Sequence, residues 1–347
     1  MSRLLVCQVG GAGDIAGGLS QVVQSLCAWS FEHVDTAPYR TRRLGSRTGT
    51  VAALLSTTVG LAHRLPARRR TVIAVHLSQG GSFLREGVLA MAAHAAGFTV
   101  VAHLHGSSFP TFARRHPRLV RSVLRQTEAV LALTDETAAA VSSAVPDATV
   151  VSIPNAVPVP AKRDKDDLVV FAGAVCRRKG VDVLLDAWSQ LTPGHGMTLS
   201  IVGPVAMDLT PWDVTADVTI CGDTAHDDVL EMMRRARLVV LPSRAEAMPL
   251  VLLEAMAAGC AAVSTDVGTI AELLRDGAGV VIAPGDTAEL VAALDSVLHD
   301  RERLDALGSA ARTRILSTYS TDAVFPRVES VWRAAADRRQ QTTAGVK

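Results

Sequence analysis

Features that mark secreted, membrane-spanning or nucleic-acid-binding proteins are largely missing from this chain. Its five cysteines are odd in number and scattered, without a Cys-x-x-Cys pair, which indicates reduced thiols rather than a disulfide framework or a zinc site. The longest apolar stretch, residues 87–101, is interrupted by His94 and Gly97 and falls short of a membrane span. A formal net charge of +1 provides no global field that would attract nucleic acid.

The ends of the chain and its local charge clusters bear on where it works. The first ten residues are too short an apolar run for a secretory signal and lead directly into a glycine loop, so we expect a cytoplasmic protein. Two basic clusters, Arg68–Arg70 and Arg114–Arg115, favour a solvated face beside an apolar strand, with a membrane surface or an anionic lipid-linked acceptor as the alternative. These clusters leave open a peripheral contact at the inner face of the membrane. The sequence predicts no particular oligomeric state.

What the chain does have is apolar residues, 48% of 347, enough to bury the cores of two domains. Short β-branched runs alternate with helix-length amphipathic segments, the pattern of parallel sheets covered by helices. We therefore expect an α/β protein with two Rossmann-like, doubly wound domains facing each other across a cleft and binding ligands at the carboxyl ends of their strands. The predicted strands are residues 4–9, 71–76, 99–104, 129–133 and 149–153 in the first half, and 168–172, 198–202, 217–221, 237–241, 261–264 and 279–282 in the second.

A stretch rich in proline and charge, residues 154–167, separates the two sets of strands and reads as the interdomain linker. The domains are predicted at residues 1–157 and 158–320. Residues 321–338 carry apolar side chains at i, i+3/i+4 and i+7, which predicts an amphipathic helix that must pack on one of the domains.

Two glutamates eight positions apart are the most informative feature of the second half. The apolar run 238–243 predicts a buried strand ending in a loop, Pro249 suits the first turn of a helix, and Gly259 suits its end. Glu246 would then lie on the loop and Glu254 within the helix, inside an otherwise apolar run. An ionised carboxylate there costs several kcal/mol unless it is paired, so a bound ligand is one source of the missing donors.

The start of that helix adds an anion site between the two glutamates. The N–H groups of Leu250 and Val251 would form the positive end of the helix at the mouth of the sheet. A sugar, a diphosphate and a ribose fit the order of carboxylate, helix start and carboxylate. The alternative is a capping glutamate followed by a second glutamate on a partly exposed helix.

A basic turn is predicted on the same edge of the sheet. The strand that ends at Gly173 is followed by Arg177-Arg178-Lys179, then Gly180 and an amphipathic helix. Such cations neutralise a diphosphate, arginine through a planar fork and lysine as a point charge. A solvent-exposed basic turn is the alternative.

These segments occur in a fixed order: Gly173 to Gly180, Ile201-Val-Gly203-Pro204, Pro242 to Gly259, and Ser264 to Asp286. Over about half of the chain they closely resemble retaining glycosyltransferases of family four, which have the GT-B fold. In the first half, the segments Gly17-Gly18-Leu-Ser, Gly81 to Arg85 and His103 to Phe109 are similar, more patchily, to the bacterial polysaccharide members of that family.

The resemblance implies roles for residues of this chain. Lys179, helped by Arg178, would bind the donor diphosphate and stabilise the departing nucleotide, Glu246 would hold sugar hydroxyls, and Glu254 would hold the ribose hydroxyls. His105 would lie near the transferred sugar. The helix over 321–338 would cross back toward the first domain. The donor-binding set implied by the family is Gly17, Gly18, Gly173, Met248, Pro249, Leu250, Val251 and Glu254. One departure from the family pattern is Ala174, where the family commonly has arginine. Either Arg177 reaches into the space beside Ala174, or the diphosphate is held by fewer cations.

Three further patterns point elsewhere. Gly11-Ala-Gly13-Asp-Ile-Ala16 fits the Ala-ended dinucleotide fingerprint of an NAD-dependent enzyme. Asp164-Lys-Asp166 is a literal Asp-x-Asp, but it falls in the polar linker and is better explained as a solvated charge run. The histidines at 76, 103 and 105 suggest a metal cluster, yet we interpret His103 as a core residue and His105 as a site residue.

The sequence therefore predicts a metal-independent transferase without a resident cofactor. It would move a sugar from a nucleotide-diphosphate donor to a cell-envelope glycan precursor, most plausibly lipid-linked. The alternatives are a secondary-metabolite glycosyltransferase, a non-catalytic GT-B subunit of a transferase complex, and the NAD-dependent oxidoreductase.

Overall fold

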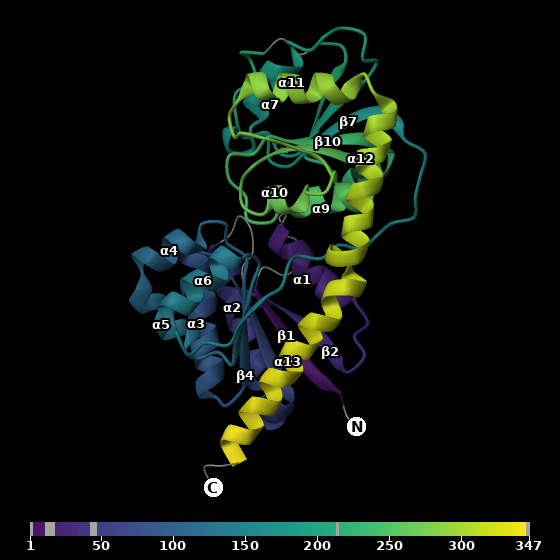
Figure 1. Cartoon of the computed structure of the whole chain (residues 1–347). Coiled ribbons are helices and arrows are strands. Elements are labelled where there is room, and N and C mark those ends of the chain that lie inside the picture. The colour runs from purple at the N-terminus through teal and green to yellow at the C-terminus, as the bar shows by residue number, and fades with distance from the viewer. Residues whose placement is uncertain (1–2, 11–17, 42–46, 213–214, 345–347) are drawn as a thin grey trace. The chain divides into compact units, whose positions relative to one another are not determined.

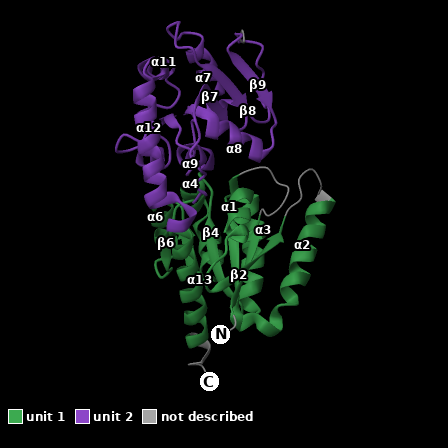
Figure 2. Cartoon of the chain, turned by 90° about the vertical axis from the view of Figure 1, so that its right-hand side faces the viewer, with its two compact units in different colours: residues 1–155, 324–347 green, residues 156–323 purple. Residues whose placement is uncertain are grey.

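The structure is a computed structural model that describes residues 3–10, 18–41, 47–212 and 215–344. The chain divides into two compact units (Figures 1 and 2): unit 1 comprises residues 1–155 and 324–347, and unit 2 comprises residues 156–323. Each unit is built on its own six-stranded sheet, so the expected α/β class with two Rossmann-like units is confirmed.

The sheet of unit 1 is parallel throughout and has the strand order β2-β1-β3-β4-β5-β6. One strand, β2, was not predicted. It lies at the edge of the sheet, where Pro38 is tolerated. Its residues are only partly buried, so its sequence lacks the continuous apolar run of a central strand. The strands are β1 (Leu4–Gly10), β2 (Val34–Arg40), β3 (Thr71–Leu77), β4 (Thr99–Leu104), β5 (Ala129–Ala132) and β6 (Val150–Ser152).

Helices cover both faces of this sheet (Figure 2). On one face lie α2 (Arg47–Ala62) and α3 (Gly81–Ala95), followed by α4 (Phe109–Arg115), α5 (Pro117–Leu124) and α6 (Asp135–Ala144), with the short η1 (Leu65–Arg70) after α2. On the other face lie α1 (Gly18–Ala28) and the C-terminal part of α13 (Thr321–Ala344). Trp332 of α13 is fully buried against the ring of Phe31, 5.2 Å between centroids, which ties the last helix to unit 1.

Unit 2 has the strand order β12-β11-β10-β7-β8-β9, again parallel. Its six predicted strands are present within two residues of the expected ends. They are β7 (Asp166–Ala172), β8 (Thr198–Val202), β9 (Val218–Gly222), β10 (Ala236–Leu241), β11 (Ala261–Thr265) and β12 (Val280–Ile282). The helices are η2 (Arg177–Lys179), α7 (Val181–Trp188), α8 (His226–Arg235), α9 (Leu250–Ala257), α10 (Ile270–Leu273), α11 (Thr287–Leu298), α12 (Arg301–Arg314) and η3 (Ile315–Tyr319).

Central strands of both sheets are buried on both faces, as parallel sheets require. Phe171 on β7 and Ile201 on β8 are fully inaccessible to solvent. Burying one side chain of this size contributes roughly 2 kcal/mol relative to leaving it exposed. These interior strands hold their carboxyl ends at fixed positions, and the loops that follow them carry the polar residues described below.

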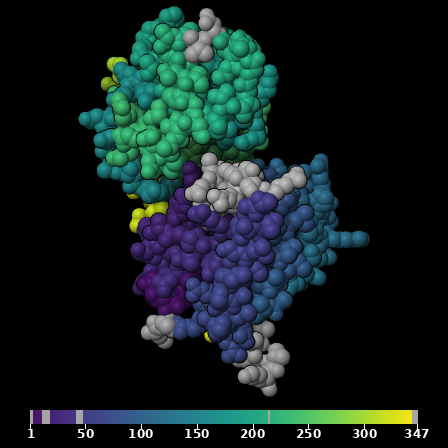
Figure 3. Space-filling view, turned by 180° about the vertical axis from the view of Figure 1, so that it is seen from behind, coloured from purple at the N-terminus to yellow at the C-terminus, as the bar shows by residue number. Residues whose placement is uncertain are grey.

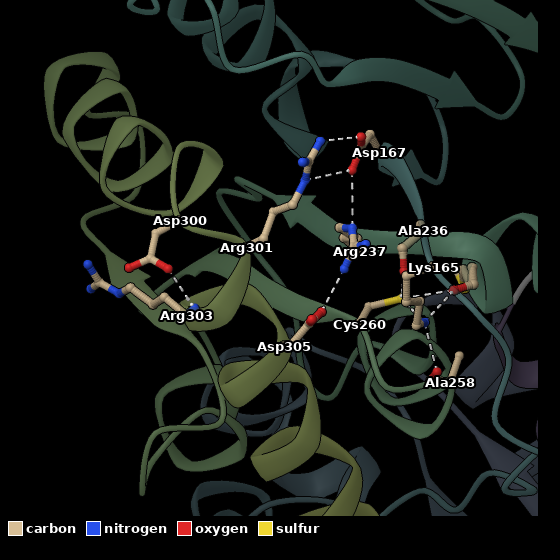
Figure 4. A network of polar contacts seen from close by, with 11 residues as sticks. Lys165, Asp167, Ala236, Arg237, Ala258, Cys260, Asp300, Arg301, Arg303 and Asp305 are labelled. Atoms are coloured by element: carbon tan, nitrogen blue, oxygen red, sulfur yellow. Dashed lines mark hydrogen bonds and ion pairs between the residues drawn. The ribbon is translucent and has the colours of Figure 1, made fainter.

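Lys165 and Asp167, at the charged end of the expected linker, prove to be part of unit 2 (Figure 4), whereas Asp164 and Asp166 are exposed, as expected of a solvated charge run. Strand β7 begins at Asp166, and the Nζ of Lys165 donates to the carbonyl oxygens of Ala258 at 2.9 Å and Met233 at 3.4 Å. Asp167 binds Arg237 at 3.2 Å and also pairs with Arg301. The charges belong to a polar network that fastens the first strand of unit 2.

Candidate functional site

A partly buried ion pair lies at the carboxyl edge of the sheet of unit 2. Lys179 ends the turn after β7, and Glu246 lies in the loop after the neighbouring strand β10. The Nζ of Lys179 is 2.6 Å from Oε1 of Glu246, and the hydroxyl of Ser243 donates to the same oxygen at 2.8 Å. The two charged side chains are 14% and 11% exposed, so the pair is largely but not fully shielded from solvent.

Glycine at position 180 permits this approach of the two loops. Gly180 has φ +74°, and a Cβ at this position would collide with the carbonyl oxygen of Pro242, the residue that follows β10. No other residue meets both requirements without strain. The backbone N–H of Arg244 also donates to the carbonyl of Arg178 at 2.8 Å, so the two loops are joined directly.

Arginine side chains also link the loops that follow β7 and β10. Arg244 forms a two-pronged ion pair with Asp182 on α7, with N–O distances of 2.8 and 2.9 Å, and these bonds hold the pKa of Arg244 above its usual range. Arg178 donates to the carbonyl oxygen of Ala245 at 3.2 Å. Arg177, one of the two explanations considered for Ala174, is 79% exposed and lies 3.9 Å from Asp182.

Helix α9 begins directly behind Glu246. Pro249 is its N-cap residue, and the first helical N–H groups bonded back to Pro249 are those of Leu252 and Leu253. The N–H groups of Leu250 and Val251 therefore precede the intrahelical bonds at the positive end of the helix, as predicted from the sequence. Met248, just before it, is 7% exposed and packs its side chain inward.

Glu254 lies in the middle of α9, and its side chain is 11% exposed. Burial raises the pKa of its carboxyl from 4.5 to about 7 because water is removed from the charged form. The sequence showed no polar partner nearby, but Nε2 of His226, the first residue of α8, lies 3.4 Å from Oε1 of Glu254. Burial lowers the pKa of His226, so this neighbour is a neutral imidazole at pH 7 and leaves the carboxyl able to bind a hydroxyl pair.

Residues at the end of β11 and in the loop after it also bind the loop that carries Glu246. The backbone N–H and the hydroxyl of Thr269 both bind the carbonyl oxygen of Ala247, at 3.0 and 3.1 Å, and the hydroxyl of Thr265 binds the carbonyl of Ser243 at 2.5 Å. Three consecutive strand ends thus fix the loop that carries the glutamate. The sequence did not reveal Thr269, whose role depends on a contact across the sheet, or Ser243, whose hydroxyl meets Glu246 only because the loop curves.

The site residues predicted in the first half lie in unit 1. His105 follows β4, and its Nε2 is 2.9 Å from Nδ1 of His76. The other ring nitrogen of His76 is 2.7 Å from Oε1 of Gln8. Burial is the main cause that lowers the pKa values of all three histidines of this cluster, that of His105 to about 4. Gly18 is the exposed first residue of α1, while Gly17 and the glycine pattern 11–16 lie outside the described residues.

His76, His103 and His105 offer ring nitrogens within 4.8 Å of one another, the spacing of a metal site. However, the indole N–H of Trp332 donates to Nε2 of His103 at 3.1 Å. Since that nitrogen accepts, the proton of neutral His103 is on Nδ1, and neither nitrogen offers a free lone pair to a metal. The cluster fits a hydrogen-bonded group of neutral imidazoles better than a three-histidine metal centre.

The arrangement in unit 2 matches a known family. Residues 152–314 match the family described as glycosyl transferases group 1. The matched segment contains Lys179, Glu246, Glu254 and the loops that hold them. The matched segment falls almost wholly within unit 2, so the likeness to this family lies in that unit.

Curated relatives match the same half of the chain. The alpha-D-kanosaminyltransferase of Streptomyces kanamyceticus is 30% identical over 178 residues, which are 49% of this chain and 46% of that protein. The glycogen synthase of Mycobacterium tuberculosis is 33% identical over 181 residues, which are 50% and 44%. The chain spans about half the length of the curated relatives it matches.

Solved structures extend the likeness to both units. The sucrose-phosphate synthase of Thermosynechococcus elongatus aligns with a TM-score of 0.75 at 17% identity, covering 96% of this chain and 99% of that one. The Anabaena protein HepE, in complex with UDP and glucose, aligns with a TM-score of 0.73 at 17% identity, covering 96% and 100%. The fold of this chain is therefore GT-B, as the sequence predicted.

Proposed function

We propose that this chain is a retaining glycosyltransferase that moves a sugar from a nucleotide-diphosphate donor to a glycan precursor of the cell envelope, carried on a lipid. The observation that carries the proposal is the Lys179–Glu246 pair beside the N-terminus of α9, with Glu254 on the same helix. A cation, a helix start and two carboxylates are the groups that would bind a diphosphate between a sugar and a ribose. The UDP complex of HepE is consistent with such a donor.

In this proposal, Lys179 shares its charge between Glu246 and the diphosphate once a donor binds. The bond between the sugar C1 and the phosphate oxygen breaks, and negative charge grows on the diphosphate, where Lys179 and the N–H groups of Leu250 and Val251 stabilise it. The acceptor oxygen attacks C1 on the same face, and its proton passes to the departing phosphate oxygen. Glu246 holds sugar hydroxyls and Glu254 the ribose hydroxyls.

The test is donor binding followed by transfer. Thermal unfolding with UDP-, GDP- and ADP-sugars should show one base that raises the melting temperature, because a ligand that binds the native state stabilises it. Donor turnover with a polyprenyl-linked glycan should follow, and it should persist in a chelator if no metal takes part. A protein that binds no nucleotide sugar would be a non-catalytic subunit or an enzyme of another kind.

A soluble secondary-metabolite acceptor is the second candidate. The relatives support no single acceptor, since their names range from glycogen synthase to D-inositol 3-phosphate glycosyltransferase. Turnover on soluble aglycones with none on polyprenyl-linked glycans would favour this candidate over the lipid-linked one.

A further inference from the structure

Exposed apolar side chains gather on one part of unit 1. Among the described residues, nine large hydrophobic side chains are exposed, and seven of them belong to three consecutive elements: α2, η1 and α3. The other two, Val205 and Leu316, lie apart in unit 2. The seven are Val51, Leu55 and Val59 on α2, Leu65 on η1, and Leu84, Val88 and Met91 on α3, between 38% and 64% exposed.

Helix α2 has an unusual outer face. Val51, Leu55 and Val59 are spaced at i, i+4 and i+8, so they form one stripe, and no charged residue occurs between Arg47 and His63. Among residues 48–62 of the helix, only Thr57 and Leu61 are buried. A surface helix of a soluble protein normally turns charged side chains outward, so this helix lacks the composition of a face that stays in water.

Helix α3 repeats the pattern. Leu84, Val88 and Met91 are spaced at i, i+4 and i+7, and the remaining exposed residues of the helix are glycine or alanine. Its two charged residues at the start, Arg85 and Glu86, pair with each other at 2.7 Å, and Glu86 is buried. The outer face of α3 therefore also presents apolar groups without charge.

Both stripes lie on the same side of unit 1. Connections from β2 to β3 and from β3 to β4 run in the same direction along the sheet, and right-handed crossovers place their helices on one face. Leu61 of α2 and Phe83 of α3 accordingly pack in the same core cluster. Figure 2 shows α2 across the sheet from α13, and Figure 3 looks onto this side of unit 1, where residues in the indigo to blue range face the viewer.

The same part of the chain carries an extreme charge imbalance that the net charge conceals. Residues 36–127 contain 14 arginines, no lysine and a single acidic residue, Glu86, whereas the whole chain has a net charge of +1. The remainder of the chain must therefore be acidic. A block of 92 residues with net charge +13 is a strong electrostatic attractant for an anionic surface.

Arginines flank the apolar stripes in space. Arg68 of η1 packs against Gly97, just beyond the end of α3, and Arg69 next to it is exposed. Helix α5 packs against α3 and exposes Arg118 and Arg121. Apolar side chains bordered by arginines are the combination by which a surface holds to anionic lipid, apolar groups entering the interface and guanidinium groups binding the headgroups.

We propose that the α2–η1–α3 face of unit 1 docks on an anionic lipid bilayer. A second copy of the chain fits less well, because a two-fold dimer would place two arginine-rich surfaces against each other. The inference builds on the lipid-linked acceptor of the proposed function by naming the surface that meets the membrane. Among the described residues no helix has the length and apolarity to cross a bilayer, so docking of this kind would be at the surface.

The test is flotation of the full chain with vesicles of phosphatidylglycerol and phosphatidylcholine, against vesicles of phosphatidylcholine alone. We expect binding to the anionic vesicles that falls about tenfold or more between low and high salt, because screening weakens the arginine contacts. Replacing Leu55→Gln and Val59→Gln together should reduce the bound fraction strongly. The matched control is Val205→Gln with Leu316→Gln, two apolar residues of unit 2 that are about half exposed, at 49% and 52%; this variant should bind like wild type.

A charge series completes the experiment. Arg68→Gln with Arg69→Gln should weaken binding about tenfold and flatten the salt dependence, whereas Arg333→Gln, exposed on α13 on the other side of the sheet, should not. Hydrogen exchange should show protection of α2 and α3 peptides on anionic vesicles, a readout that excludes a misfolded variant as the explanation. Equal binding to neutral vesicles, no binding, or a concentration-dependent dimer that buries α2 would overturn the proposal.

Failure of this inference can be told apart from failure of the proposed function. Transfer to a water-soluble acceptor analogue by a protein that does not bind vesicles would refute the docking face alone. Vesicle binding by a protein that turns over no nucleotide sugar would refute the transferase alone.

Discussion

The indole of Trp332 and the imidazole of His103 are joined by a hydrogen bond of 3.1 Å between residues 229 positions apart. This bond fastens α13 to β4 inside unit 1. It also sets the protonation of His103, since an indole can only donate and the imidazole nitrogen facing it must accept. Protonating His103 on that nitrogen would break the bond and charge a buried ring, so the cluster resists acid until unit 1 opens.

We therefore predict that unit 1 is acid-labile. Burial lowers the pKa of His105 to about 4 and the pKa values of His76 and His103 well below their usual range. Below about pH 6.5 these histidines take up protons in the unfolded chain but stay neutral in the folded unit. The free energy of unfolding is therefore highest above that pH and decreases as the pH falls toward 4. The lowered pKa of His105 alone accounts for a loss of up to about 3 kcal/mol in the free energy of unfolding. Calorimetric melting of the chain at pH 7, 5.5 and 4.5 should show the loss.

The matched variant is His105→Gln, which keeps a polar side chain but cannot titrate. Its melting temperature should depend less steeply on pH than that of wild type in the same window. A wild-type melting temperature that does not change between pH 7 and 4.5 would contradict neutral, buried imidazoles.

Glu254 provides the opposite pH dependence in unit 2. Burial raises the pKa of its carboxyl from 4.5 to about 7, so the folded unit disfavours the ionised form. The protonated carboxyl carries no penalty below about pH 4.5; the penalty grows as the pH rises from 4.5 to about 7 and stays constant above that. Glu254→Gln should therefore gain stability relative to wild type between pH 5 and pH 8 by about 2 kcal/mol. Urea unfolding, monitored by amide exchange of β10 and β11, measures this difference in stability.

The same carboxyl predicts a pH-dependent affinity for the nucleotide. Ribose hydroxyls bind an ionised carboxylate better than a protonated one, so donor affinity of wild type should fall by up to about tenfold from pH 8 to pH 6. In Glu254→Gln the affinity should be low and independent of pH. Isothermal titration with the nucleoside diphosphate decides this, and a wild-type affinity that rises toward pH 6 would exclude the ribose role.

Much of unit 2 was predictable because its signals are local. Strand β10, the loop with Glu246 and helix α9 are marked by an apolar run, then by Pro249 and Gly259, all within 22 residues. The partner of Glu254 was not predictable, since His226 begins another helix and approaches it only in the folded sheet. Ser243 was missed for a related reason: its hydroxyl meets Glu246 through the curvature of the loop, which spacing alone does not reveal.

Less of unit 1 could be predicted from the sequence. Strand β2 contains Pro38 and polar residues because it is an edge strand, so it lacks the apolar run that marked the other strands. The basic part of the proposed docking face was visible as the cluster Arg68–Arg70. Its apolar half was not, because an apolar helix predicts burial, and the structure was needed to show that α2 leaves Val51, Leu55 and Val59 exposed.

Gly180 should be far less tolerant of alanine than another glycine of similar backbone conformation. Gly180 has φ +74° and Gly194 has φ +95°, so alanine strains the backbone at both positions. At Gly194 a Cβ meets no atom within 4 Å, and the cost should stay near 1–2 kcal/mol. At Gly180 the Cβ collides with the carbonyl of Pro242, so Gly180→Ala should also push the Lys179 turn away from the β10 loop. Melting temperature and nucleotide affinity should both fall in this variant, whereas in Gly194→Ala the affinity should be unchanged.

The Lys179–Glu246 pair allows structural and catalytic roles to be separated. Lys179→Met leaves the Glu246 carboxylate, 11% exposed, with the Ser243 hydroxyl but without its cation, so unit 2 should lose stability and transfer should drop by about 10²–10³-fold in kcat. The double variant Lys179→Met with Glu246→Gln removes both charges and should recover most of the stability, because no uncompensated buried charge remains. Its activity should stay as low as that of the single variant, since the departing diphosphate still lacks the cation. A double variant that regained transfer along with stability would mean that Lys179 acts only as the partner of Glu246.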